Sequence, residues 1–200
     1  MALRTTLLDA VNQLLSAVGG AAVVSLDTDN PEVTTAVAIL EETTQVVLSE
    51  GWNFNTEKEY PFQPNNDDEI LVGDNIISIT TSRPKHYADY QIVERQGKLY
   101  DKLSHSYTFD ETLYCDVVWG FEFEDCPQPF KNYITAKACR IYASRLVGSK
   151  EQVELVSQDE AITRAACLEY DATTGQPNLF SHQNGQDTYI SFIPLRTLAR

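Results

Sequence analysis

The sequence predicts an α+β fold: an antiparallel bundle of about four helices with an inserted antiparallel β-rich subdomain and an extended C-terminal arm. Apolar residues recur at three- and four-residue steps near both ends of the chain, which is typical of amphipathic helices. In the middle they recur at every second residue, which is typical of strands. The predicted division is a helical bundle in residues 1–54 and 125–174, a β-rich insertion in residues 55–124 and an arm in residues 175–200.

The first predicted helix begins after Thr6 and ends at Gly19–Gly20. Thr6 is a good N-cap, and Asp9 places a negative charge in the first turn, where it favours the helix dipole. The two glycines end the helix because glycine readily adopts the left-handed conformation of a C-cap. One apolar stripe is expected to face the core, and it comprises Leu7, Leu8, Val11, Leu14, Leu15 and Val18.

The second predicted helix begins at Asn30–Pro31, an N-cap followed by a first helical residue, and ends at Gly51. Its apolar stripe comprises Val33, Val37, Leu40 and Val47. Thr43 and Thr44 interrupt this stripe. We therefore expect the middle of the helix to be less stable than its ends.

The stretch SEGWNFNTEKEYPF, Ser49–Phe62, changes from a helical to a strand pattern within a few residues. Trp52 and Phe54 fall at this joint, directly after the glycine that ends the helix. Two roles fit such large aromatic side chains: packing in the seam between bundle and sheet, or contact with a neighbouring subunit. In either role they would stiffen the connection between the two parts of the chain.

Strand-like runs occupy most of residues 56–123. Short runs around Ile70, Ile77 and Tyr90 are separated by turn residues, and Gln96–Gly97 predicts a tight hairpin. The clearest strand is LYCDVVWGFEF, residues 113–123, in which alternate side chains predict one buried face. That face comprises Leu113, Cys115, Val117, Trp119, Phe121 and Phe123.

A long helix is predicted within residues 124–148. Pro127 and Pro129 suit its first turn, where the missing N–H groups have no partner to lose, and Gly148 ends it. Its apolar stripe comprises Phe130, Tyr133, Ile134, Ala138, Ile141, Tyr142 and Leu146.

The last predicted helix runs from a capping-box pattern at Ser149 and Gln152 to about Asp171. Its apolar stripe is expected to complete the bundle, because four stripes of similar length can close one core. This stripe comprises Leu155, Ile162, Ala166 and Tyr170.

The chain carries 29 acidic residues against 15 basic ones, a net charge of −14. Such a surface repels nucleic-acid phosphates, which argues against a sequence-reading DNA-binding protein but permits a wall that DNA passes without adhering. The four cysteines lack the paired spacing of zinc or redox sites, so we expect reduced, buried thiols. No run of about 18 apolar residues occurs, so no membrane insertion is expected.

The sequence contains no phosphate-binding glycine loop, nucleophile elbow or zinc-protease motif. We therefore predict that the chain is not an enzyme and needs no metal or cofactor. Two other functions stay open. Paired carboxylates such as Glu122 and Glu124 could serve a polysaccharide hydrolase, or the chain could be a small acidic oligomeric binding module.

Four motifs occur in a characteristic order along the chain. NFN follows a helix that ends in EGW, GKLYD lies at residues 97–101, and CLEYD ends at Asp171. The pattern P-x-x-F-x-x-x-I-x-x-K-A-x-R is formed by Pro127, Phe130, Ile134, Lys137, Ala138 and Arg140. With these motifs, roughly residues 6 to 172 of the chain resemble the tail tubular protein A family of short-tailed bacteriophages.

The resemblance implies a structural virion protein: a gatekeeper or adaptor forming a dodecameric ring between the portal protein and the tail nozzle, which is a tail tubular protein B-like protein. The genome would pass through the ring without sequence-specific binding. The ring would be assembled in the cytoplasm of the host bacterium and would reside in the virion tail.

Two groups of residues are candidates for contacts in such a ring. Lys137, Arg140 and Arg145 lie near one helical face, and they would form either intersubunit ion pairs or ion pairs within the acidic chain. The arm is expected to dock on the portal or on a neighbouring subunit. Its candidate residues are Phe180, Tyr189, Phe192, Ile193, Arg196 and Arg200.

Overall fold

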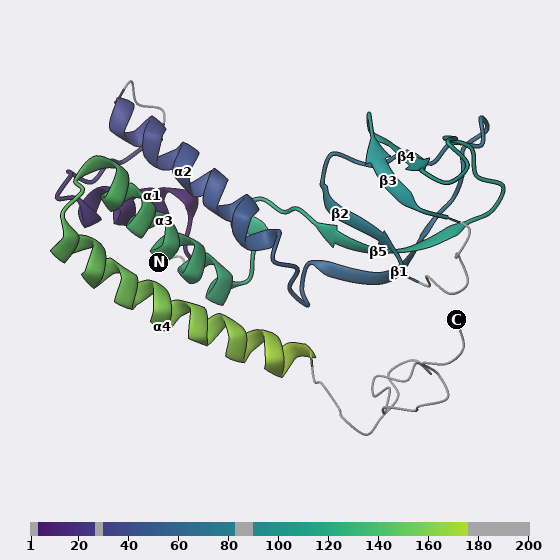
Figure 1. Cartoon of the computed structure of the whole chain (residues 1–200). Coiled ribbons are helices and arrows are strands. Elements are labelled where there is room, and N and C mark those ends of the chain that lie inside the picture. The colour runs from purple at the N-terminus through teal and green to yellow at the C-terminus, as the bar shows by residue number, and fades with distance from the viewer. Residues whose placement is uncertain (1–3, 27–29, 83–89, 176–200) are drawn as a thin grey trace.

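The computed structural model describes residues 4–26, 30–82 and 90–175. The described helices lie at one end of the molecule and the strands at the other, which gives it an elongated shape (Figure 1). This content confirms the predicted α+β class. The helices are α1 (Leu7–Ala17), α2 (Pro31–Leu48), α3 (Gln128–Leu146) and α4 (Lys150–Gly175), and together they are called the helical part.

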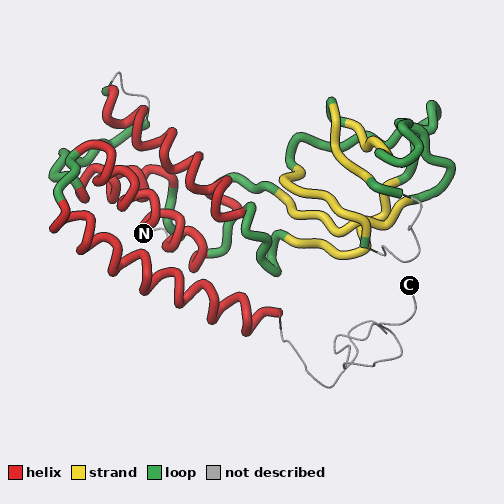
Figure 2. The backbone as a smooth tube through the Cα atoms, in the orientation of Figure 1, coloured by secondary structure: helices red, strands yellow, loops and turns green. Residues whose placement is uncertain are grey.

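The described strands form two small antiparallel sheets (Figure 2). One has the order β1-β5-β2, and the other is the β3-β4 hairpin. Gln96 and Gly97 form the predicted turn of this hairpin, with φ of 55° and 70°. The strands are β1 (Thr56–Phe62), β2 (Ile76–Thr81), β3 (Ile92–Arg95), β4 (Lys98–Asp101) and β5 (Leu113–Trp119), and together they are called the β part.

The predicted ends of the first two helices are confirmed. The hydroxyl of Thr6 accepts a hydrogen bond from the backbone N of Asp9 at 3.2 Å, and the Asp9 carboxylate accepts one from the backbone N of Thr6 at 3.1 Å. Asn30 caps α2 by accepting from the backbone N of Glu32 at 2.9 Å. Gly51 follows α2 with φ of 73°, a conformation that favours glycine.

The middle of α2 is continuous, so the two threonines that interrupt its predicted apolar stripe do not interrupt the helix. Thr43 and Thr44 are buried, and their hydroxyls donate to the backbone oxygens of Ile39 (2.6 Å) and Leu40 (2.8 Å). Threonine can satisfy its hydroxyl on the preceding turn of its own helix. The two residues therefore enter the core without an unpaired polar group.

Each end of the molecule has its own hydrophobic cluster. In the helical part, α1, α2 and α3 supply most of the buried side chains, and Trp52, Phe123 and Cys167 join them. In the β part, Phe109, Leu113 and further residues make a smaller cluster. The connections between α2 and β1 and between β5 and α3 therefore link two separately packed cores (Figure 1).

The predicted strand over residues 113–123 ends earlier, at Trp119. The backbone N of Gly120 donates to the backbone oxygen of Asn75 at 2.7 Å, and the chain then turns towards the helical part. Phe121 is exposed, and Phe123 begins a short 3₁₀-helix (Phe123–Asp125) and packs in the helical cluster. The period-two pattern continues across the joint because both sides of the joint need apolar residues, so periodicity alone could not locate the end of the strand.

The helix α4 extends beyond its predicted end, to Gly175, and its predicted apolar stripe is left largely exposed. Leu155 and Ile162 are 65% and 68% exposed, and Ala166 and Tyr170 are also exposed. The inward side instead carries Cys167, which is the one buried residue of this fully described helix. At the start of α4, Ser149 bonds to Glu151 and Gln152 reaches across to the backbone oxygen of Ala17, so the predicted capping box does not form.

Candidate interaction surfaces

Trp52 lies buried where the helical part meets the β part. Its indole Nε1 donates to the backbone oxygen of Val47 at 2.7 Å, and its ring meets that of Phe130 edge-on at 5.0 Å between centroids. The indole is thus held by the last turn of α2 on one side and by α3 on the other. The structure places Trp52 in the seam between the two parts.

Asn55, the last residue of the NFN motif, is the polar centre of this seam, a role that the sequence analysis did not assign to it. It is fully buried, and its Oδ1 accepts from the backbone N of Trp52 at 2.8 Å. Its Nδ2 donates to the backbone oxygens of Leu48 and Trp119, both at 2.9 Å, and its own backbone oxygen accepts from the backbone N of Trp119 at 2.7 Å. One amide therefore joins the end of α2, the turn after it and the end of β5.

Phe54 lies half-buried at the same joint, within a group of aromatic rings. Its centroid lies 4.4 Å from that of Phe130 and 6.2 Å from that of the exposed Phe121, on which it stacks. Tyr170 of α4 meets Phe130 edge-on at 6.1 Å. Such aromatic pairs add stability beyond the area they bury, so these rings reinforce the seam.

Asn53 connects the seam to the last turns of α4. Its backbone N donates to Asp171 Oδ1 at 2.8 Å, and its side-chain Nδ2 donates to Asp171 Oδ2 at 3.0 Å and to the backbone oxygen of Asp171 at 3.1 Å. NFN and CLEYD, two motifs 118 residues apart, thus meet in space. The sequence analysis identified both motifs, but it could not show which of their atoms are in contact.

The structure pairs the three candidate cations of α3 with carboxylates of the same chain. Arg145 makes a two-pronged contact with Glu42, with N–O distances of 2.9 and 3.1 Å. Lys137 Nζ lies 3.5 Å from Glu50 Oε1, and the guanidinium of Arg140 bonds to Glu160 of α4. The alternative of ion pairs inside the acidic chain therefore has direct geometric support, and a contact with a neighbouring subunit would have to compete with these pairs.

A fourth cation, Arg164, was not singled out from the sequence. Its guanidinium donates to the Tyr133 hydroxyl at 2.8 Å and lies 3.3 Å from Glu50 Oε2. The hydroxyl and Glu50 raise the pKa of Arg164, Tyr133 contributing most, so it stays charged. Together with the bond between Arg140 and Glu160, this contact holds α4 on α3 through polar groups.

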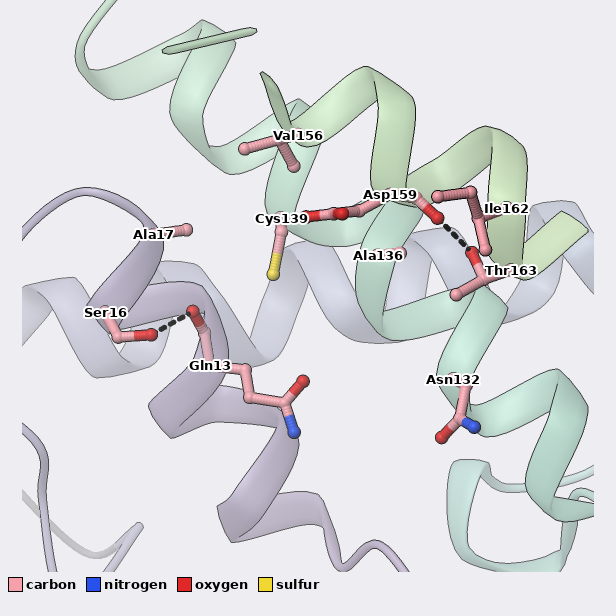
Figure 3. A pocket seen from close by; sticks show the side chains of 10 residues that line it. All are labelled: Gln13, Ser16, Ala17, Asn132, Ala136, Cys139, Val156, Asp159, Ile162 and Thr163. Atoms are coloured by element: carbon pink, nitrogen blue, oxygen red, sulfur yellow. Dashed lines mark hydrogen bonds between the residues drawn. The ribbon is translucent and has the colours of Figure 1, made fainter. Parts of the chain in front are cut away.

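A cavity of about 540 Å³ lies where α4 meets α1 and α3 (Figure 3). Cys139 projects from α3 between the two outer helices, with Ala17 of α1 and Val156 of α4 on its flanks. Burial, and to a smaller extent the nearby Asp159 carboxylate, raise the pKa of the Cys139 thiol to about 12, so the thiol is protonated and unreactive while α4 covers it. Ile162, from the exposed stripe, forms part of the cavity lining.

Glu122 and Glu124, the candidate carboxylate pair, do not share a strand face, because β5 ends before them. Both residues are exposed at the crossing from β5 to α3, and Glu124 Oε1 accepts weakly from the backbone N of Leu7 at 3.4 Å. Within residues 4–26, 30–82 and 90–175, no group of His, Cys, Asp and Glu side chains is arranged to hold a metal ion. Phe180, Tyr189, Phe192, Ile193, Arg196 and Arg200, the candidate residues of the arm, lie outside the described residues.

The four cysteines, Cys115, Cys126, Cys139 and Cys167, are free thiols and all are buried. No helix in the described part of the chain combines the length and apolar character needed to cross a bilayer.

Comparison with known proteins gives two matches. The family model of tail tubular proteins matches residues 8–177, which is most of the chain. Tail tubular protein A of Klebsiella phage KP34 is 29% identical over 157 residues, a match that covers 76% of this chain and 80% of that protein. The match spans all four helices and both sheets and includes the seam. The chain thus belongs to the tail tubular protein family, and it is a structural component of a phage tail rather than an enzyme.

Proposed function

We propose that this chain is the subunit of a dodecameric adaptor ring that joins the portal to the tail nozzle and surrounds the exiting genome. Membership of the tail tubular protein family supports a role in tail assembly. The elongated shape also fits a subunit that must contact its neighbours in the ring and another layer of the tail (Figure 1). The ring would assemble in the host cytoplasm and would remain in the virion.

The outward apolar stripe of α4 is the observation that carries this proposal. A helix in a single folded chain normally turns its apolar stripe towards the core. Leu155 and Ile162 instead leave about two-thirds of their side-chain surface exposed, on a helix with one buried residue. In a ring, each α4 would cover this stripe with a neighbouring copy, and the contact would repeat around the axis because it joins two different surfaces.

The rigidity of the seam is a second observation that supports the same proposal. A subunit that transmits force between two tail layers needs a stiff connection between its ends. Asn55 ties three backbone segments together at this connection, and Trp52 fills the space beside it. Buried, fully satisfied polar groups of this kind fix one geometry because any other arrangement would leave them unpaired.

The net charge of −14 suits the inner wall of a DNA channel. Proteins that hold DNA gain affinity by neutralising phosphates and releasing counterions, and an acidic wall gains nothing in this way. DNA would therefore slide past such a ring instead of adhering to it.

The test is particle mass by light scattering, with negative-stain images, for the chain alone and mixed with its portal. We expect rings of about twelve times the 22.5 kDa subunit mass, either alone or on the portal. Ile162→Asp should abolish the rings without unfolding the subunit, because the side chain is exposed in the single chain.

The matched control is Leu71→Asp, which places the same charge at a 59% exposed leucine of the β part. It should leave the rings intact. A chain that stays monomeric in the presence of its portal would refute the ring. Normal rings formed by Ile162→Asp would show that α4 is not part of the interface between subunits.

A further inference from the structure

A second cavity, of about 570 Å³, lies at the seam on the side of α1 and α2. It is called the seam pocket here. Its apolar lining comes from the start of α1, from the loop after α1 and from the connection between β5 and α3. The residues that supply this lining are Leu7, Leu8, Leu26, Phe121 and Phe123. The volume falls within the range of cavities that bind ligands or side chains.

The rim of the seam pocket is acidic. Glu41, Glu122 and Glu124 line it, all three are exposed, and no lysine or arginine is among the lining residues. Within the described part of the chain, none of these three glutamates has a salt bridge, whereas the adjacent Glu42 is paired with Arg145. An apolar floor with unneutralised carboxylates around it fits a segment that carries both apolar and cationic side chains.

The C-terminal segment of this chain has that chemistry. Residues 188–200, TYISFIPLRTLAR, contain two arginines and no acidic residue, in a chain with 29 acidic residues. Pro194 disfavours a helix across the middle of the segment, so an extended conformation is expected. The large apolar side chains of this segment are Tyr189, Ile190, Phe192, Ile193, Leu195 and Leu198.

The described chain ends close to the seam pocket. Gly175 lies against the side chain of Asn53, since a Cβ added at Gly175 would come within 2.5 Å of Asn53 Nδ2. The next residue, Phe54, stacks on Phe121 of the pocket lining. Residues 176–187 can span at most about 40 Å when fully extended, so residues 188–200 start within this distance of the seam.

We infer that the seam pocket binds the C-terminal segment, residues 188–200, of the neighbouring subunit. This inference rests on the proposed ring, which brings identical subunits side by side. Apolar side chains of the segment fill the pocket, and Arg196 and Arg200 pair with the carboxylates of the rim. Because each subunit gives one segment and receives another, the contact continues around the ring and closes with it.

Photo-crosslinking within the assembled full-length chain tests this inference. Phe192 is replaced by benzoylphenylalanine, equal amounts of ¹⁵N-labelled and unlabelled subunits are mixed before assembly, and the irradiated peptides are mapped by mass spectrometry. We expect cross-links to the start of α1 and to the connection between β5 and α3, joining labelled to unlabelled chains. Particle mass is measured on the same sample, so a failure to form rings is seen separately.

Charge variants give the second measurement. Glu122→Lys with Glu124→Lys should reduce the cross-link yield at least tenfold, and adding Arg196→Glu with Arg200→Glu should restore it. Asp110→Lys with Glu111→Lys is the matched control, since it makes the same charge change at exposed residues of the β part and should leave the yield unchanged.

Three results would overturn the inference while rings still form: cross-links only within one copy, cross-links only to the portal, or cross-links elsewhere on the neighbouring subunit. Absence of rings would instead refute the proposed function on which the inference depends.

Discussion

The helices α3 and α4 follow one another in the chain and pack side by side, yet they are built in opposite ways (Figure 1). Nine of the 19 residues of α3 are buried, against one of the 26 residues of α4. The described contacts between them include polar ones, such as the bond between Arg140 and Glu160 and the bond between Arg164 and Tyr133. The longer helix is therefore the less anchored one.

An apolar stripe therefore indicates that a helix packs against a partner, but it does not indicate which partner. On α3, Phe130, Ile134 and Ala138 face the core of their own chain. On α4, a stripe of the same kind faces outward, and a few inward residues with polar contacts are enough to hold the helix in place. We interpret α3 as the scaffold of the subunit and α4 as the element held ready for assembly.

Phe130→Ala should give the largest loss of stability. The ring is fully buried and touches Trp52, Phe54 and Tyr170, so its removal leaves a cavity at the seam. We expect the free energy of unfolding to fall by about 3–5 kcal/mol. Urea denaturation followed by tryptophan fluorescence measures this change.

The matched control is Tyr170→Ala, which removes the α4 ring from the same cluster. Because Tyr170 is 37% exposed, we expect a loss of about 1 kcal/mol. Equal losses for the two variants would show that α4 is as much a part of the core as α3, and would remove the basis of the comparison.

The sequence was sufficient to predict the fold class and the positions of the helices, because caps, end glycines and periodicity are local signals. It could not show which side of α4 faces the core, because an apolar stripe has the same periodicity whether it faces the core or the solvent. It placed Trp52 and Phe54 at the joint and included Asn55 in the NFN motif, but it could not assign the role of Asn55, whose three partners lie up to 64 residues away. Hydrogen-bond partners at such separations are set by the fold and leave no local pattern.

The rate of thiol labelling should distinguish the contact between α3 and α4 from the β part. Cys139 of α3 lies where α4 packs, Cys167 lies on the inward side of α4, and Cys115 lies inside the β part. Burial raises the pKa of each of these thiols to about 12, so a disulfide reagent at pH 8 can react only after the covering structure opens and the pKa returns to about 8.5. We expect Cys139 and Cys167 to be labelled together, at least tenfold faster than Cys115.

The pH dependence provides an internal check. Labelling of all three thiols should accelerate as the pH rises towards 8.5, because the reactive thiolate forms in the opened state. Labelling of Cys115 at the same rate as Cys167 would mean that α4 opens only when the whole chain unfolds. Mass spectrometry of the labelled peptides distinguishes the sites.

Asn53→Ala should give the smallest effect and should act on α4 alone. It removes the two side-chain bonds to Asp171, both on the exposed side of the seam, and leaves the backbone bond in place. The expected loss is about 1 kcal/mol in the opening of α4, equivalent to labelling of Cys167 about fivefold faster. Because the unfolded chain also lacks these bonds, the free energy of global unfolding should fall by no more than this amount.

Asn12→Ala is the control for this last change, because its amide also makes two hydrogen bonds, to the backbone N and O of Val23 at 2.8 and 2.9 Å. These bonds tie α1 to the loop that follows it and do not involve α4, so labelling of Cys167 should be unaffected. If both variants accelerate labelling equally, the opening that exposes Cys167 involves the whole helical part. If only Asn53→Ala does so, α4 opens as a separate unit, and the contact between NFN and Asp171 controls how readily it opens.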